Sequence, residues 1–107
     1  MNVITELETT IGRTTNKGPR ITRVWHCGDH TIRARVAHDS YRQQSYAVAE
    51  VLTPNMTWTE ICETPPEDFH AEPFAHDRKP TPTEDELVKL ADELMRRACR
   101  NRRIPTA

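Results

Sequence analysis

The residues best suited to chemistry lie at one expected hairpin tip, where two histidines flank a thiol. Residues 26–30 (HCGDH) contain a Cys-x2-His pair, which is the spacing of half a zinc site. A closed structural zinc site needs four ligands, usually from two such pairs. No second pair follows, because Cys62 and Cys99 stand alone in the sequence. Cys27 and His30 are therefore the best metal candidates, and we expect no bound metal.

Nucleophile and base side chains are present, but without the arrangement that catalysis requires. Residues 38–40 (HDS) contain the residue types of a serine triad. Successive residues of a strand point to opposite faces, so these three cannot act together. Cys27 or Cys62 could pair with a histidine, yet nothing in the neighbouring sequence activates either thiol. The chain also lacks a glycine-rich nucleotide loop. We therefore expect no enzymatic activity and no cofactor.

Basic residues gather in two stretches that could contact phosphates. Residues 12–42 contain seven Arg and Lys against two Asp, and residues 96–103 add five arginines. Arg33 and Arg35 fall on one face of an expected strand, where a nucleic-acid backbone could bind. Aromatic residues for base stacking are few, however, and the net charge of the chain is −1. Nucleic-acid binding is therefore the alternative function, and its candidate residues are Arg20, Arg33, Arg35, Arg96, Arg100 and Arg103.

A β-hairpin is the clearest local structure. Residues 20–27 and 30–38 alternate around Gly28-Asp29, which favours a two-residue type II′ turn because glycine takes positive φ at little cost. Such a turn sets the register of the two strands. The face expected to lie toward the core carries Ile21, Trp25, Ile32 and Val36, with Arg23 among them. We expect the head of this arginine to reach water.

Three further segments, residues 3–11, 45–52 and 56–62, also alternate with a period of two and are expected strands. The last strand could face the core with either of two sets, Met56 and Trp58 or Thr57 and Ile61. Five strands joined by short connections predict an antiparallel meander, open or curled into a small half-barrel.

A proline-rich acidic strap, residues 63–82, separates the strands from the last element. Residues 60–77 hold six acids and no Lys or Arg, and the prolines prevent a sheet or a long helix. Phe69 and Phe74 are expected to dock on the domain. One hypothesis is that the strap covers the basic sheet face until a partner displaces it. Deletion of residues 66–79 should then raise affinity for a polyanion at low salt.

Residues 83–103 predict an amphipathic helix with signals at both ends. Thr83 and Glu86 fit a capping box, acids fill the first turn, and arginines gather in the last turns. One apolar stripe runs along it and should cover a face of the sheet. This stripe consists of Leu87, Leu90, Ala91, Leu94 and Ala98.

These elements predict one α+β domain of 107 residues, a four- to five-stranded antiparallel meander or small half-barrel with one C-terminal amphipathic helix packed on it. Its parts are the β-sheet half 1–62, the strap 63–82, the helix 83–103 and the tail 104–107. No apolar run approaches the length of a membrane span, and no signal peptide is visible. Three cysteines without a close pair favour free thiols. We expect a cytoplasmic protein that does not bind membranes.

The remaining function class is protein binding, since a small domain can offer sheet edges and a helix flank to a partner. Twelve Arg against three Lys is typical of high-GC genomes. We therefore expect a small non-enzymatic protein-binding module from an actinobacterium or actinobacteriophage. Its partner would be a host or phage protein, and a homodimer would use the same surfaces.

Overall fold

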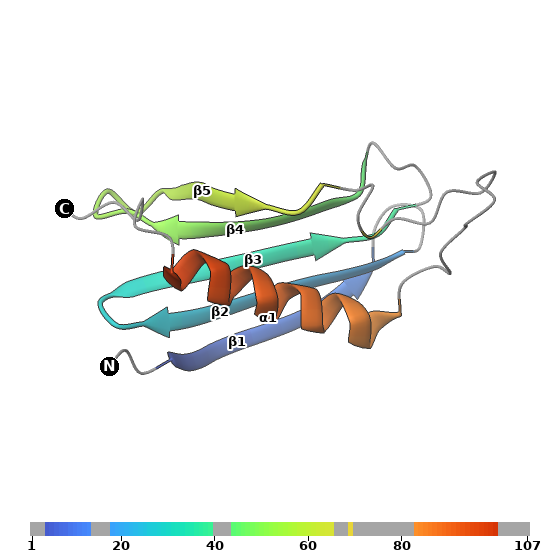
Figure 1. Cartoon of the computed structure of the whole chain (residues 1–107), viewed down its shortest axis with the longest axis horizontal. Coiled ribbons are helices and arrows are strands. Elements are labelled where there is room, and N and C mark those ends of the chain that lie inside the picture. Colours follow the sequence, from blue (N-terminus) through green and yellow to red (C-terminus); the bar gives the residue numbers. More distant parts are fainter. Residues whose placement is uncertain (1–3, 14–17, 40–43, 66–68, 70–82, 101–107) are drawn as a thin grey trace.

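The chain folds as a five-stranded antiparallel sheet with one helix packed on it (Figure 1). The computed structural model describes residues 4–13, 18–39, 44–65, 69 and 83–100. The elements are β1 (Ile4–Arg13), β2 (Pro19–Cys27), β3 (His30–Ala37), β4 (Tyr46–Leu52), β5 (Trp58–Glu63) and α1 (Glu84–Arg100). Strands follow one another in the sheet in the order of the sequence. The α+β meander predicted from the sequence is confirmed.

The hairpin formed by β2 and β3 has the expected register. Trp25 lies opposite Ile32 and Ile21 lies opposite Val36, so the apolar side chains share one face. Gly28 has φ 62°, while Asp29 after it keeps a negative φ, as a type II′ turn requires. Local turn chemistry therefore set the pairing of the two central strands.

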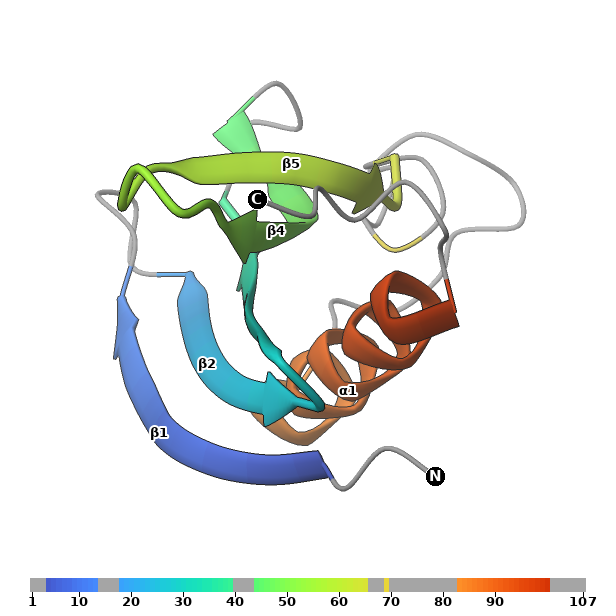
Figure 2. The same cartoon turned by 90° about the vertical axis from the view of Figure 1, so that its left-hand side faces the viewer.

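The helix α1 covers one face of the sheet, packing on β2, β3, β4 and β5 (Figure 2). Small residues meet at this contact, with Ala34 and Ala49 in the sheet and Ala91 in the helix all fully buried. Their short side chains let helix and sheet approach closely and leave little void. The larger residues of the core are Ile21, Trp25, Ile32, Val36, Leu87, Leu94 and Met95.

The helix begins at the predicted capping box. The Glu86 N–H donates to Thr83 Oγ1 at 3.2 Å, and the Thr83 N–H donates to Glu86 Oε1 at 3.2 Å. The described helix ends at Arg100, and residues 101–103 of the predicted element lie outside the described residues. No helix in the described part of the chain combines the length and the apolarity needed to cross a membrane.

Two bulges bend the outer strands. Leu7 is the extra residue of β1 between Glu6 and Glu8, and Ile61 is the extra residue of β5. Ile61 packs against the core as in the second orientation considered for this strand, but Thr57, its expected companion, is exposed and precedes β5. Trp58 instead shares the opposite face with Leu52, the residue across from it.

Met56 lies in the turn before β5 rather than in the strand, with φ 62° and 75% of its surface exposed. Most residues with a Cβ are strained in the left-handed region, but asparagine is an exception and tolerates it. Met56→Asn should therefore raise the free energy of unfolding by about 0.5 kcal/mol. Urea denaturation measures this change. An unchanged or lowered midpoint would contradict it.

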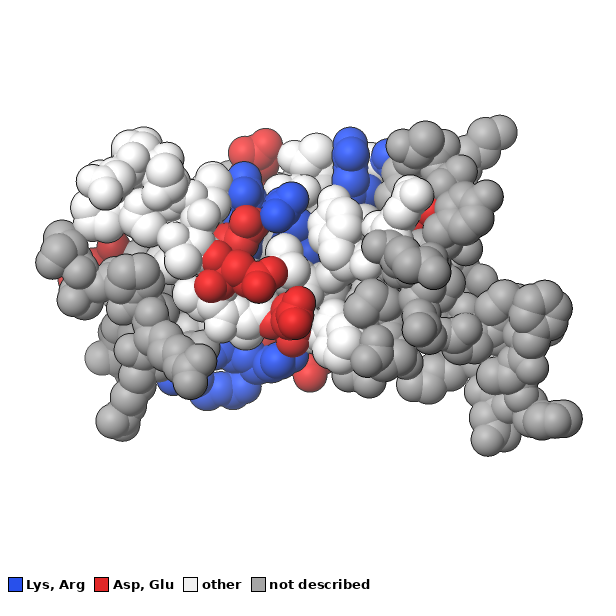
Figure 3. All heavy atoms as spheres, turned by 90° about the horizontal axis from the view of Figure 1, so that it is seen from above, with Lys and Arg blue, Asp and Glu red and all other residues white. Residues whose placement is uncertain are grey.

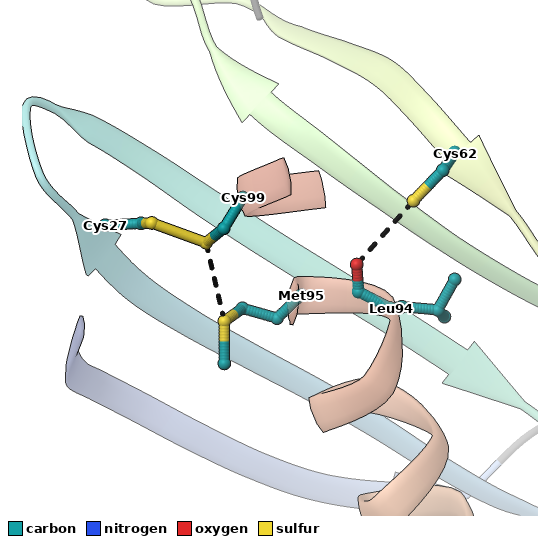
Figure 4. The surroundings of a disulfide bond; sticks show 5 residues. All are labelled: Cys27, Cys62, Leu94, Met95 and Cys99. Atoms are coloured by element: carbon teal, nitrogen blue, oxygen red, sulfur yellow. Dashed lines mark hydrogen bonds between the residues drawn. A yellow bond between two sulfur atoms is a disulfide. The ribbon is translucent and has the colours of Figure 1, made fainter. Parts of the chain in front are cut away.

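A disulfide joins Cys27 at the end of β2 to Cys99 in the last turn of α1 (Figure 4). The expectation of three free thiols is therefore wrong for these two cysteines. Their 72-residue separation hides the pairing, because it arises only once the helix lies along the sheet. Cys62 is free, and its thiol donates to the Leu94 carbonyl at 3.6 Å. Burial raises the pKa of Cys62, which keeps this thiol protonated.

Within the strap, Phe69 is partly buried against the helix-side core, as expected. Phe74 and the remainder of residues 70–82 lie outside the described residues. The proposed cover over the basic sheet face stays a prediction for the same reason.

Candidate functional site

The two arginines predicted to contact nucleic acid lie on the open face of the sheet, the face opposite α1, and both bind Glu50. Arg33 Nε donates to Glu50 Oε1 at 3.0 Å. Arg35 donates to both carboxylate oxygens, from Nε at 2.8 Å and from a terminal nitrogen at 3.2 Å. Glu50 is only 7% exposed. One buried carboxylate therefore compensates part of the charge of both arginines.

Aromatic rings cover the same two guanidinium groups. The Arg33 guanidinium lies 4.2 Å from the centroid of the Trp58 ring, and that of Arg35 lies 5.5 Å from that of Tyr46. Both distances fit cation–π contacts. Both of these rings on the open face are therefore engaged within the protein.

The ionisation of Glu50 reflects two opposing effects. Burial by itself would raise the pKa of this carboxyl, but the hydrogen bonds and charges of Arg33 and Arg35 outweigh it and hold the pKa below its ordinary value. Reciprocally, the hydrogen bond to Glu50 raises the pKa of Arg35. Basic and acidic side chains also adjoin in the middle of the view in Figure 3. The open face of the sheet therefore carries charges of both signs.

Of the other predicted nucleic-acid residues, Arg20 shares the open face with this pair, whereas Arg96 and Arg100 lie on the helix. Arg20 is exposed near the start of β2, beside Gly12 of β1. Arg96 binds Asp92 through Nε at 2.8 Å. Arg100 is exposed at the end of the helix, which the disulfide ties to the other end of β2. Arg103 lies outside the described residues.

The metal and triad candidates are equally dispersed. Cys27 is bonded to Cys99, so it offers no thiolate to a metal. Among the described residues no group of three His, Cys, Asp or Glu side chains could hold an ion, and His30 lies opposite Cys27 on the neighbouring strand. His38 and Asp39 are buried beyond the end of β3, and Ser40 lies outside the described residues.

A hollow of about 280 Å³ lies between the end of β5 and α1. Its walls include Thr64, Phe69 and Leu90. Arg97, the basic group in it, donates to Thr64 Oγ1 at 3.0 Å and to the Glu63 carbonyl at 3.1 Å. Its cation thus fastens the chain after β5 to the helix.

The most unusual surface is the edge strand β1. This strand pairs with β2 and forms the outer edge of the curved sheet in Figure 2. All ten residues of β1 are exposed except Gly12, which is half-buried. Three of these side chains are large and apolar, with Ile4, Leu7 and Ile11 exposed to 40%, 49% and 51%. Long, exposed apolar edges of this kind are rare because they invite pairing with another chain.

Arg23 closes the core beside β1. Its guanidinium lies 4.6 Å from the centroid of the Trp25 ring and donates to the Val88 carbonyl of α1 at 3.3 Å. It also binds the Glu6 carboxylate at 3.0 Å. The hydroxyl of Thr9 also donates to Glu6. The hydrogen bond from Thr9 is the largest cause that lowers the pKa of Glu6, and the one from Arg23 is the next. The sequence marked Arg23 as an exception in the apolar face, and the structure shows it bridging β1 and α1.

The opposite edge of the sheet is different. The strand β5 has six residues against ten in β1. It exposes two acids, Glu60 and Glu63. Short, charged edges are typical of strands protected against pairing. The two edges of the sheet are therefore unequal, and β1 is the one open to a partner strand.

Comparisons with protein-family models, with curated proteins and with solved structures find no match. The candidate site is therefore defined by the structure itself, as the uncovered edge strand β1.

Proposed function

We propose that the protein is a protein-binding module that acts by adding a partner strand to the edge of β1. The single observation that carries this proposal is the exposure of β1 on both faces, its large apolar residues included. Edge strands are usually short, charged or covered. The strand β5 fits this description better than β1, which is longer and exposes large apolar residues.

Strand addition explains how such a surface would bind. Backbone hydrogen bonds along an open edge supply affinity, and alternate side chains supply specificity. Leu7 and Ile11 offer apolar contacts, while Glu6 and Glu8 favour a partner with basic residues. The partner strand would come from a host or phage protein or from another copy of this chain.

The geometry favours this function over nucleic-acid binding. Arg33 and Arg35 share one carboxylate and two aromatic rings, so their charge is already engaged on the open face. A phosphate would have to compete with Glu50 at both sites.

A photo-crosslinking amino acid at position 7 should yield a covalent adduct with a protein partner in cells. The same residue at position 56 should not, because Met56 is even more exposed but lies in a turn away from the β1 edge. Mass spectrometry of the adduct identifies the partner. If position 7 gives no adduct, or no more than position 56, strand addition at β1 is wrong.

A further inference from the structure

We propose, on the basis of the function proposed above, that the strand which binds β1 is β1 of a second copy. Two chains would pair antiparallel about a two-fold axis and join their sheets into one. Closed two-fold dimers are the commonest assemblies of identical chains, because the same patch serves both partners.

The pairing of β1 with β2 fixes which face each residue of β1 occupies. Opposite residues of an antiparallel pair share a face, so each β1 residue takes the face of its β2 partner. The helix side of β1 carries Ile4, Glu6, Thr9, Ile11 and Arg13. The open side carries Thr5, Glu8, Thr10 and Gly12, and Leu7 is the bulge.

Every symmetric antiparallel register of two β1 strands keeps these faces continuous, so the charges of the paired residues decide among the registers. If Thr10 lies opposite Thr10 of the second copy, Thr9 meets Ile11 and Glu8 meets Gly12. Leu7 is the extra residue of the bulge and takes no partner, so the next residue, Glu6, lies on the helix side opposite Arg13. Every direct pair shares a face, and the register is symmetric about Thr10.

Charge favours this register. Arg13 of each copy approaches Glu6 of the other on the helix side, so two pairs of opposite charge form by symmetry. Glu8 faces a glycine and meets no like charge. The aliphatic stem of Arg13 also covers Leu7, which is 49% exposed in the single chain.

The competing pairings bring acids together. Two β5 edges placed together would oppose Glu60 and Glu63, and a β1 strand on β5 of another copy would bring Glu6 and Glu8 to a strand whose only charged residues are acids. Like charges across strands are destabilising. A β1–β5 contact would also leave a free edge at each end, so it would extend into a ring or a filament instead of a closed pair. The β1–β1 dimer avoids both.

Sedimentation velocity over the micromolar range tests the dimer with the full chain. The wild type should be dimeric at the upper end, and Arg13→Glu should raise the dissociation constant about tenfold, because it sets a glutamate against Glu6. Lys89→Glu is the matched control, the same charge reversal at an exposed position of α1. It should leave the constant unchanged.

The register has its own test. In a Cys62→Ser background, Thr10→Cys should form an intermolecular disulfide on mild oxidation, and Thr5→Cys should not. A chain that stays monomeric overturns the dimer, as does a dimer in which Arg13→Glu has no effect. A dimer without the Thr10 crosslink overturns the register. If the chain is monomeric but the position 7 crosslink captures another protein, the dimer fails and strand addition stands; without that capture, both fail.

Discussion

Replacing Cys27 and Cys99 together by serine should lower the free energy of unfolding by about 4 kcal/mol. The disulfide closes a loop across 72 residues of sequence, and cutting it restores that much chain entropy to the unfolded state. Small domains have stabilities of roughly 5–15 kcal/mol, so this is a large share of the total. The change also frees the last turn of α1, which the bridge fastens to β2.

Urea denaturation followed by circular dichroism measures this effect. Cys62→Ser is the matched control, because it removes a cysteine that is outside the bridge. It should cost about 1 kcal/mol or less, the value of one weak hydrogen bond to the Leu94 carbonyl. Adding a reductant to the wild type should reproduce the double variant. Equal midpoints for the oxidised wild type and the double variant would contradict a structural role for the bridge.

The same cysteines report on the compartment in which the protein works. Rapid acid quenching followed by a thiol-reactive mass tag should modify one cysteine per chain where the bridge is intact and three where it is reduced. Disulfides persist in oxidising compartments and are rare in the cytosol. A single tag in protein from its native source would therefore contradict the expected cytoplasmic location, and three tags would support it.

Sequence patterns were sufficient where local chemistry decides the structure. The turn at Gly28-Asp29 fixed the register of β2 with β3, and Thr83 with Glu86 fixed the start of α1. Both features depend on residues within a few positions of one another. Periodicity then assigned the apolar faces of the hairpin and of the helix correctly, whereas it left the orientation of the last strand open.

Long-range contacts could not be predicted in the same way. The alternation of residues 3–11 resembles that of the central strands, and only its place at the edge of the finished sheet leaves β1 uncovered. Glu50 was not recognised as the partner of Arg33 and Arg35, because this requires the register between β3 and β4. That register depends on a connection longer than a tight turn. The face that composition predicts to be basic therefore carries a cluster in which Glu50 compensates part of the charge of Arg33 and Arg35.

Replacing Glu50 by alanine should lower the free energy of unfolding by about 3 kcal/mol. Glu50 is the buried partner, and its removal leaves without their anion two arginine side chains that are only 24% and 38% exposed, which is destabilising. Here Arg33 and Arg35 lie two residues apart on the same face and would repel one another. Glu50→Gln keeps an acceptor and should cost less than alanine, about 1–2 kcal/mol. Glu60→Gln is the matched control, since Glu60 lies opposite Glu50 but is exposed, and it should change stability by less than about 0.5 kcal/mol.

The pH dependence of stability separates the charge of Glu50 from its packing. Its pKa in the folded protein is lower than that of an unfolded glutamate, so the folded state binds fewer protons. Its contribution is therefore complete above the unfolded pKa of about 4.3 and is lost as the pH falls through the lower folded value. The difference in unfolding free energy between wild type and Glu50→Gln should shrink over this acidic window, while Glu60→Gln should show no such trend. A difference that stays constant from neutral pH into the acidic range would mean that Glu50 stabilises the sheet by shape alone.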